Sequence, residues 1–233
     1  MYEISVANLT YLLIPVSIVG YFYFRWVGNR VEIFYASLRM LLQLLLVGYL
    51  LSYVFDSKTS YMTIFIVVIM ISAASMITMR NITKKNIQVY RSIFVSIFIG
   101  GSVNLFLVLY FVLEIDSFDN PRYIIPIAGM LYANCMNAVS LVAERFEKER
   151  LNSSYKEARA NAFKASLIPQ INSFLAVGLV SLPGMMTGQI LSGVDPIVAV
   201  RYQIMVMFMV LGSSGISTIL YLLQKRDKIS AEE

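Results

Sequence analysis

The side chains that could do chemistry in this sequence are mostly amides and thioethers. The 233 residues include 13 methionines, one cysteine and no histidine. That composition leaves out the usual zinc, haem and copper ligand sets. The chain also lacks the metalloprotease, serine-hydrolase, paired-cysteine and phosphate-loop motifs. We therefore expect no catalytic residue, no enzyme activity and no cofactor bound by this chain, so any ATP that drives it must be hydrolysed by another subunit.

Amide side chains recur inside otherwise apolar runs. The candidates for a substrate pathway or gate are Asn134, Asn137, Gln170, Asn172 and Gln203. Asn134 and Asn137 are three residues apart and would share one face of a helix. Such amides either join neighbouring helices by hydrogen bonds or line a pathway for a solute, and the sequence leaves both interpretations open. Arg201 is costlier to place in a membrane, so it is a further pathway candidate, with Asp195 as the expected partner.

One segment combines helix-breaking residues with thioethers. Residues 178–188 read GLVSLPGMMTG, in which Pro183 removes an amide donor and Gly184 further weakens a helix. Broken helices at membrane depth occur where the backbone is buried in protein or lines a cavity. We predict a gate or substrate site at Pro183, Gly184, Met185 and Met186; the alternative is a helix end followed by a re-entrant turn. Thioethers can bind soft metals, but methionine more often fills gaps in a core. The sequence therefore leaves it unknown whether this segment binds a metal and which one.

Seven apolar runs must position these side chains. The chain is 58% hydrophobic and 14% charged, whereas soluble domains carry about 25% charged residues. The runs cover residues 5–24, 36–55, 61–79, 92–113, 123–143, 167–190 and 197–223. Because about 20 apolar residues cross a bilayer core, we predict an all-α, polytopic integral membrane protein with about seven transmembrane helices. We expect one domain over residues 1–233, multi-pass in the cell membrane.

Glycine and proline predict two local features of these runs. Gly100–Gly101 in the fourth run predicts close contact with a neighbouring helix. Pro169 and Pro183–Gly184 predict interruptions in the sixth run. The first run lacks a preceding basic region and a small-residue cleavage site, so we expect a retained helix rather than a signal peptide.

Basic residues predict the orientation. With the N-terminus outside and the C-terminus cytoplasmic, the cytoplasmic loops hold every lysine and arginine except Lys58, Arg122 and Arg201. This distribution accounts for the net charge of +5 without a nucleic-acid partner.

The longest polar stretch, residues 144–164, separates the fifth and sixth runs. Its charged composition favours helix. A permease driven by a separate ATPase must receive force through a short cytoplasmic helix that contacts that ATPase, and residues 151–165 suit this role. The alternative is a solvated loop that extends two membrane helices.

Three strings resemble the iron-export ABC permease family of the FetB type, which includes the plant aluminium-sensitivity permeases. They are LRMLLQLLLVGYLL (38–51), PIAGMLYANCMNAVSL (126–141) and SLIPQINSFLAVGLVSLPGMMTGQILSGVDPIVAVRYQIMVMF (166–208). The resemblance covers nearly the whole chain. It implies a permease that exports iron or a related metal or solute. It also implies an assembly of two permeases with two cytosolic P-loop ATPases, which would bind the ATP and Mg²⁺.

The resemblance also implies which residues contact the ATPase. The family's coupling motif reads LGA(T/S) followed by three residues and an alanine. The matching residues here are Leu151, Asn152, Ser153, Ser154, Tyr155, Lys156, Glu157 and Ala158. Leu151 and Ala158 match, whereas Asn152 replaces the glycine and the polar stretch is shorter than in typical members. A gradient-driven secondary transporter or channel, and a membrane scaffold that recruits an ATPase without transport, are the alternatives.

Overall fold

The computed structural model describes residues 5–29, 31–56, 60–80, 82, 85–115 and 120–229, and its regular elements are helices. The helices are α1 (Val6–Leu9), α2 (Leu13–Val27), α3 (Glu32–Asp56), α4 (Ser60–Met79), α5 (Ile87–Leu107), α6 (Pro121–Glu149), α7 (Tyr155–Ala176), α8 (Gly184–Leu191) and α9 (Pro196–Ile229). A 3₁₀ turn (Thr10–Leu12) joins α1 to α2, and a π-helical turn (Val108–Val112) extends α5. The predicted all-α class is confirmed.

Six helical stretches in the described part of the chain are long and apolar enough to cross a bilayer. They are Ala7–Val27, Glu32–Leu51, Tyr61–Met79, Ile87–Val112, Pro121–Glu149 and Pro196–Lys225. They coincide with six of the seven predicted runs, which confirms a polytopic membrane protein. The remaining run, 167–190, is divided between α7 and α8. The count of seven and the orientation of the termini stay predictions.

The first of two compact units, Met1–Ser57, contains α1 to α3. Gly28 ends α2 in the left-handed conformation, with φ of 80°. Glu32 Oε2 then accepts hydrogen bonds from the Tyr23 hydroxyl at 2.6 Å and the Asn29 amide at 3.0 Å. These bonds tie the end of α2 to the start of α3. The unit is therefore an apolar helix pair joined by a short polar turn.

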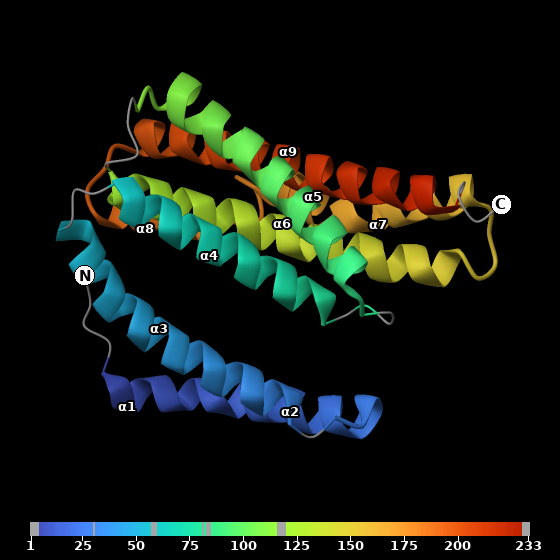
Figure 1. Cartoon of the computed structure of the whole chain (residues 1–233). Helices are drawn as coiled ribbons and strands as arrows, with labels where there is room; N and C mark the ends of the chain where they lie inside the picture. The colour runs from blue at the N-terminus through green and yellow to red at the C-terminus, as the bar shows by residue number, and fades with distance from the viewer. Residues whose placement is uncertain are drawn as a thin grey trace. The chain divides into compact units, whose positions relative to one another are not determined.

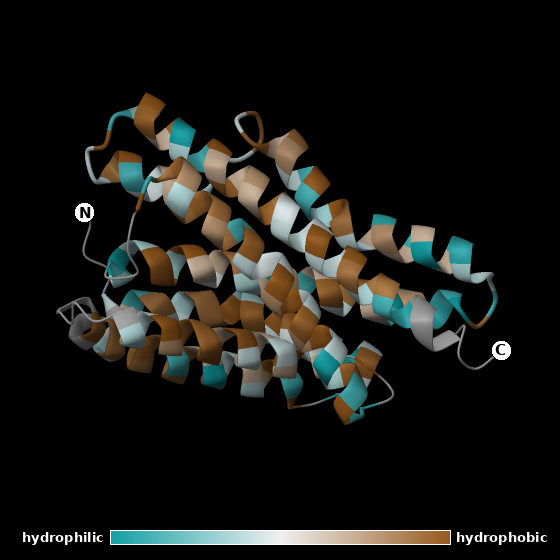
Figure 2. Cartoon of the chain, turned by 45° about the horizontal axis from the view of Figure 1, so that its top comes forward, coloured by the Kyte–Doolittle hydropathy of each residue, from teal (hydrophilic) through white to brown (hydrophobic). Residues whose placement is uncertain are grey.

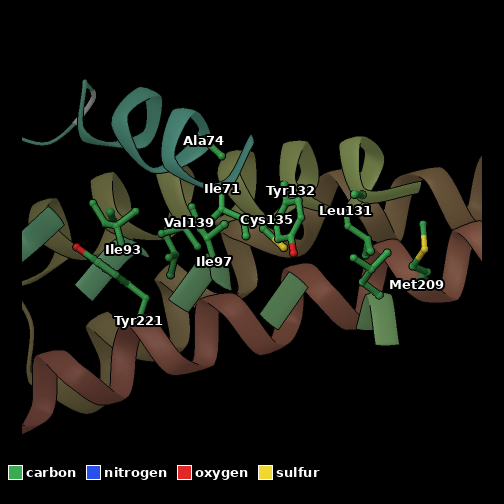
Figure 3. Close-up of a cluster of buried hydrophobic side chains, with 14 of the residues drawn as sticks. Ile71, Ala74, Ile93, Ile97, Leu131, Tyr132, Cys135, Val139, Met209 and Tyr221 are labelled. Atoms are coloured by element: carbon green, nitrogen blue, oxygen red, sulfur yellow. The ribbon is translucent and has the colours of Figure 1, made fainter. Parts of the chain in front are cut away.

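The second unit, Lys58–Glu233, packs the remaining helices around a buried core. Within it α6 lies alongside α7 and α9, and α5 crosses α6 and α9 (Figure 1). Large buried side chains from three helices meet in this core, among them Ile97, Tyr132 and Tyr221 (Figure 3). The expected single domain over residues 1–233 stays a prediction, because two compact units can belong to one membrane domain.

Small and polar residues bring α5 and α9 of this unit into close contact. Four buried residues spaced four apart share one face of α5: Ser92, Ser96, Gly100 and Asn104. A Cβ built on Gly100 would lie 2.8 Å from the backbone nitrogen of Ser217, so the two helix backbones nearly touch. Gln224 of α9 donates a hydrogen bond to Ser96 Oγ at 3.0 Å. Because small residues permit such approach, the close contact predicted at Gly100–Gly101 is confirmed.

The element between α6 and α9 is broken at one of the two predicted places. The predicted interruption at Pro169 is wrong, because Pro169 lies inside α7 and the helix continues to Ala176. A proline keeps a helical φ and removes a single amide donor, which a 22-residue helix tolerates. The break occupies residues 177–183, and Pro183 immediately precedes α8. The interruption predicted at Pro183–Gly184 is confirmed.

Candidate functional site

A largely apolar pocket of about 490 Å³ lies beside the break between α7 and α8. Its lining includes Phe174 of α7, Val177 and Leu182 in the break, Met186 of α8, and Gln203 and Phe208 of α9. Phe174 and Phe208 form an edge-to-face pair, with ring centroids 6.0 Å apart. The pocket therefore joins the predicted gate segment to the first turns of α9.

Gln203 supplies the pocket's side-chain amide. Its side chain is 6% exposed, and its Oε1 accepts no hydrogen bond from any described residue. A buried acceptor without a donor costs about 1–3 kcal/mol. A single buried polar group in an apolar lining is also the usual means by which a pocket orients a ligand. Gln203 is thus the lining residue best suited to recognise a hydrogen-bond donor.

The break itself is an ordered turn. The amides of Leu179, Val180 and Ser181 all donate to the Ala176 carbonyl, at 3.2, 2.8 and 3.2 Å. The Gly178 amide donates to the Ser181 carbonyl at 3.0 Å. Gly178 has φ of +83°, a conformation that residues with a Cβ rarely adopt. Glycine is therefore required at this position for the turn to form without strain.

The length of the flanking helices sets the depth of the break. Lys164 is the last charged residue of α7. At about 1.5 Å per residue, α7 rises about 18 Å from Lys164 to Ala176, and α8 is about 12 Å long. Together these lengths match the bilayer core of about 30 Å. If α7 and α8 cross the membrane in line, the break at 177–183 falls inside its core, where the polar backbone needs protein or a cavity around it.

Two of the ten predicted pathway residues line this pocket, and three more lie next to it in sequence. Met186 and Gln203 line it. Pro183 and Gly184 lie at the start of α8, and Met185 packs against the buried core. The predicted gate segment and the last helix thus contribute to one site, although no sequence spacing relates them.

The other predicted pathway residues lie outside the pocket lining. Gln170 is 6% exposed and donates to Ser214 Oγ at 3.4 Å, which joins α7 to α9. Asn134 donates to the Met130 carbonyl of its own helix at 2.8 Å. The exposed members of the set are Asn137, Asn172 and Arg201. Their proposed roles in a pathway stay predictions.

Asp195 has a different contact from the one expected. Its Oδ1 accepts hydrogen bonds from the amides of Ile197 at 2.8 Å and Val198 at 3.3 Å, so it caps the N-terminus of α9. Arg201 is exposed near the same helix end, from which a long side chain can extend to the membrane surface. No ion pair joins Asp195 to Arg201 among the described residues.

The predicted coupling residues form the turn between α6 and α7 and the first turn of α7. Ser154 begins α7 with a capping box: its Oγ accepts from the Glu157 amide at 3.3 Å, and its own amide donates to Glu157 Oε2 at 3.2 Å. Arg150 donates to the Ser153 carbonyl at 3.2 Å. Leu151 is 81% exposed at the tip of this turn. The exposed members of the set also include Asn152, Lys156 and Glu157.

Tyr155 connects this turn to the last helix. Its hydroxyl donates to the Leu222 carbonyl of α9 at 3.0 Å. Its ring packs edge-to-face on Phe146 of α6, with centroids 5.8 Å apart. Ala158, the last of the predicted coupling residues, is fully buried. The turn is therefore held to α6, α7 and α9 at once, and displacement of the turn must be shared by all three helices.

The metal-ligating capacity of the described residues is small. They contain no group of three or more histidine, cysteine, aspartate or glutamate side chains that could hold a metal ion. The pocket instead offers the thioethers of Met186 and Met207 and the amide of Gln203. Sequence reasoning did not identify the walls formed by Phe174 and Phe208, because an apolar side chain carries no distinguishing signal in so apolar a chain.

These features define a polytopic helical membrane protein, with a broken element beside an apolar pocket and a rigid, exposed turn at one end of the bundle. The chain belongs to the uncharacterised protein family UPF0014, whose model matches residues 5–229. The sequence resemblance to the family of the FetB type is thereby confirmed.

Three relatives illustrate this membership. The chain is 32% identical over 216 residues to a UPF0014 membrane protein of Synechocystis, covering 84% of this chain and 82% of that protein. It is 35% identical over 205 residues to the probable iron export permease protein FetB of Escherichia coli, covering 81% and 78%. It is 31% identical over 207 residues to the protein ALUMINUM SENSITIVE 3 of Arabidopsis thaliana, covering 81% and 73%. No solved structure matches the chain significantly.

Proposed function

We propose that this chain is the permease subunit of an ABC transporter that exports iron or a related metal or solute across the plasma membrane. In this proposal a separate cytosolic P-loop ATPase binds ATP and Mg²⁺, and two permeases work with two ATPases. The similarity to an Escherichia coli protein named as a probable iron export permease supports it. So does the similarity to a plant protein named for aluminium sensitivity.

The α6–α7 turn is the observation that carries this proposal. Hydrophilic residues gather at this end of the bundle (Figure 2). Leu151 in the turn is nevertheless 81% exposed. An exposed apolar side chain on a rigid, otherwise polar turn fits a pocket on a soluble partner. Because Tyr155 joins the turn to α9, movement of a docked ATPase would displace α6, α7 and α9 together.

The same movement would reach the pocket through α7. This helix begins at the turn and ends with Phe174 in the pocket wall, immediately before the break. Joint displacement of α7 and α9 would shift Phe174 and Gln203 relative to Met186 of α8, because the break lets α8 move separately from α7. The proposed consequence is alternating access of the pocket to the two sides of the membrane.

The test is purification of the tagged full-length chain from native membranes in mild detergent, followed by mass spectrometry and an ATPase assay. We expect a stoichiometric P-loop ATPase with vanadate-sensitive activity. Leu151→Asp should abolish co-purification of the ATPase, because a charge replaces the apolar anchor, whereas Leu151→Met should retain it. Both variants should melt at the native temperature, since Leu151 makes little buried contact.

Two outcomes would contradict the proposal. An eluate without an ATPase, even after crosslinking, would favour a gradient-driven transporter or channel. A stoichiometric ATPase without flux of iron or another metal in proteoliposomes would favour a scaffold that only recruits the enzyme.

A further inference from the structure

The interface between α5 and α9 is polar along much of its length. Buried small and polar residues line it at four-residue spacing from both helices: Ser92, Ser96, Gly100 and Asn104 of α5, and Ser213, Ser217 and Tyr221 of α9. At about 1.5 Å per residue, the stretch from Ser92 to Asn104 covers about 18 Å of a bilayer core of about 30 Å. Polar groups at this depth need partners within the protein, because lipid supplies none.

Three contacts show that these two polar faces meet. Ser96 Oγ accepts its hydrogen bond from α9 at 3.0 Å. Ser217 Oγ lies against the position that a Cβ of Gly100 would take. Further along, Asn104 Oδ1 lies 2.7 Å from a Cβ built on Gly212. The polar face of α5 is therefore paired with the polar face of α9 over the whole stretch.

Three buried hydroxyls in this interface have no hydrogen-bond partner among the described residues. They are Ser92 Oγ, Ser217 Oγ and Tyr221 Oη. By contrast Ser75, which is equally buried in α4, donates to the Ile71 carbonyl of its own helix at 2.8 Å. A serine in a membrane helix can thus satisfy itself, and helix packing alone does not require open hydroxyls. The partner that the open hydroxyls lack is one that water can supply.

The interface leads from a charged end of the bundle toward the pocket. Arg91 directly precedes its first serine on α5, and Lys225 follows its last polar residue on α9. At the other end, Ser214 of α9 accepts a hydrogen bond from Gln170 of α7 at 3.4 Å. Phe174, one helical turn beyond Gln170, lines the pocket. Buried polar groups therefore extend from the charged end to the pocket wall.

The α6–α7 turn is bonded to α9 beside this interface. Tyr155 donates to the Leu222 carbonyl, next to Tyr221. In the described conformation the backbones nearly touch at Gly100 and Ser217, so nothing can pass between α5 and α9. Passage requires α9 to move away from α5, and movement of the turn would act on α9 directly. Each open hydroxyl would then gain water as a partner.

We propose that the α5–α9 interface is the route by which water and the solute pass between the charged end of the bundle and the pocket. Separation of the helices along their polar faces exposes hydroxyls and amides to water, which costs less than exposure of an apolar contact. The inference rests on the proposed function, because it assigns the path that leads to the pocket. If the hydroxyls only hold two helices together, the interface stays closed to water.

Thiol accessibility in opened membrane fragments, in which both faces meet the reagent, tests this route. The background is Cys135→Ala, so each variant holds one thiol. Ser96→Cys and Ser214→Cys place the thiol in the route, and Ser75→Cys is the control. All three serines are fully buried, and Ser75 and Ser96 each lie five residues from an arginine.

Reaction with a small, charged methanethiosulfonate is measured without nucleotide and with Mg²⁺-ATP and vanadate. In at least one of these states, both route thiols should react at least tenfold faster than the control. The unfolding midpoint of each variant shows whether it folds. Ser92→Cys and Ser213→Cys occupy the same interface and replace a route variant that does not fold.

The other outcomes overturn the route. Protection of both route thiols in both states leaves the hydroxyls as helix contacts. Equally fast reaction of all three thiols shows that buried serines are generally accessible. Reaction of Ser96→Cys alone shows a crevice that ends before the pocket.

Co-purification of the ATPase is scored on the same membranes. A vanadate-sensitive ATPase with protected route thiols refutes the route alone, whereas fast reaction of the route thiols without an ATPase refutes the proposed function alone.

Discussion

Gly100 leaves no room for an added side-chain carbon. A Cβ there would lie 2.8 Å from the Ser217 nitrogen and 3.0 Å from its Cα, both of which are backbone atoms that cannot rotate away. Gly100→Ala should therefore separate α5 from α9 and destabilise the fold by about 1–3 kcal/mol, as overpacking of a core does. The unfolding midpoint in detergent, followed by intrinsic fluorescence, measures this effect.

Gly215→Ala on α9 is the matched control for this substitution. Nothing lies within 4 Å of a Cβ built on Gly215. Alanine is also the better helix former, by roughly 0.5–1 kcal/mol. We expect the midpoint of Gly215→Ala to stay the same or rise. Equal loss of stability in both variants would show that α5 and α9 are not as close as described.

Gln203 is buried, and its Oε1 accepts no hydrogen bond from the described residues. A substitution that removes this acceptor should therefore keep or raise stability while it lowers function. Gln203→Met keeps the length of the side chain and removes the unpaired Oε1. Since an unsatisfied buried acceptor costs about 1–3 kcal/mol, the variant should be at least as stable as the native chain. If the pocket binds the transported solute, solute-stimulated ATPase activity of the purified complex should fall at least tenfold.

Gln170→Met provides the comparison for this prediction. The Gln170 amide donates to Ser214 Oγ at 3.4 Å between α7 and α9, so its loss removes an interhelical hydrogen bond. Gln170 Oε1, like Gln203 Oε1, has no donor among the described residues, so Gln170→Met removes the same unsatisfied acceptor and an interhelical bond besides. We therefore expect the unfolding midpoint of Gln170→Met to lie below that of Gln203→Met. Normal stimulated activity in Gln203→Met would exclude Gln203 from solute recognition.

At the scale of the elements, the capping box of Ser154 and Glu157 fixes the residue at which α7 begins. Ser154→Ala removes the acceptor for the Glu157 amide and should cost about 1 kcal/mol. Amides 156–158 should consequently exchange with deuterium roughly fivefold faster. Hydrogen-exchange mass spectrometry of the detergent-purified protein measures this difference.

Ser153→Ala is the control for that experiment, because Ser153 contributes its carbonyl, which alanine keeps, to the bond from Arg150. Its exchange pattern should match that of the native chain. Identical protection of α7 in both variants would mean that the Ser154–Glu157 pair does not hold the turn, and the rigid connection used in the proposed mechanism would lose its basis.

The membrane helices could be predicted closely because lipid selects for uninterrupted apolar segments. The predicted run 61–79 and the observed α4 (Ser60–Met79) differ by one residue. Outside the membrane this constraint is absent, so the sequence alone could not show where the polar stretch 144–164 divides into two helices and a turn. Its charged residues continue α6 to Glu149 and begin α7 at Tyr155. The short turn between the two helices depends on contacts with α9.

The candidate site was only partly predictable, for a related reason. Met186 and Gln203 are unusual enough in their runs to be selected from the sequence, but their meeting in one pocket depends on how α8 folds back against α9. The interruption expected at Pro169 does not occur, because proline's effect depends on whether neighbouring helices support the chain. Phe174 and Phe208 became recognisable as pocket walls once α7 and α9 were placed together.

At the scale of the whole molecule, the α6–α7 turn and the pocket lie at opposite ends of α7. The turn with Leu151 lies at the end of α6, and the break at 177–183 lies about 18 Å beyond the last charged residue of α7. Energy from an ATPase could therefore act on the pocket without the ATPase approaching it. This arrangement requires the α6–α7 turn to face the cytoplasm and the turn after α8 to face outside.

Thiol labelling in intact cells tests that orientation. Asn152 and Ser192 are exposed in the α6–α7 turn and after α8, and the buried Cys135 makes the native chain an unlabelled control. The excess of basic residues around the α6–α7 turn predicts that this turn is cytoplasmic. A membrane-impermeant maleimide should therefore label Ser192→Cys in intact cells and Asn152→Cys only after permeabilisation. The reverse pattern would place the turn outside the cell, where no cytosolic ATPase could reach Leu151, and the coupling mechanism would be excluded together with the orientation.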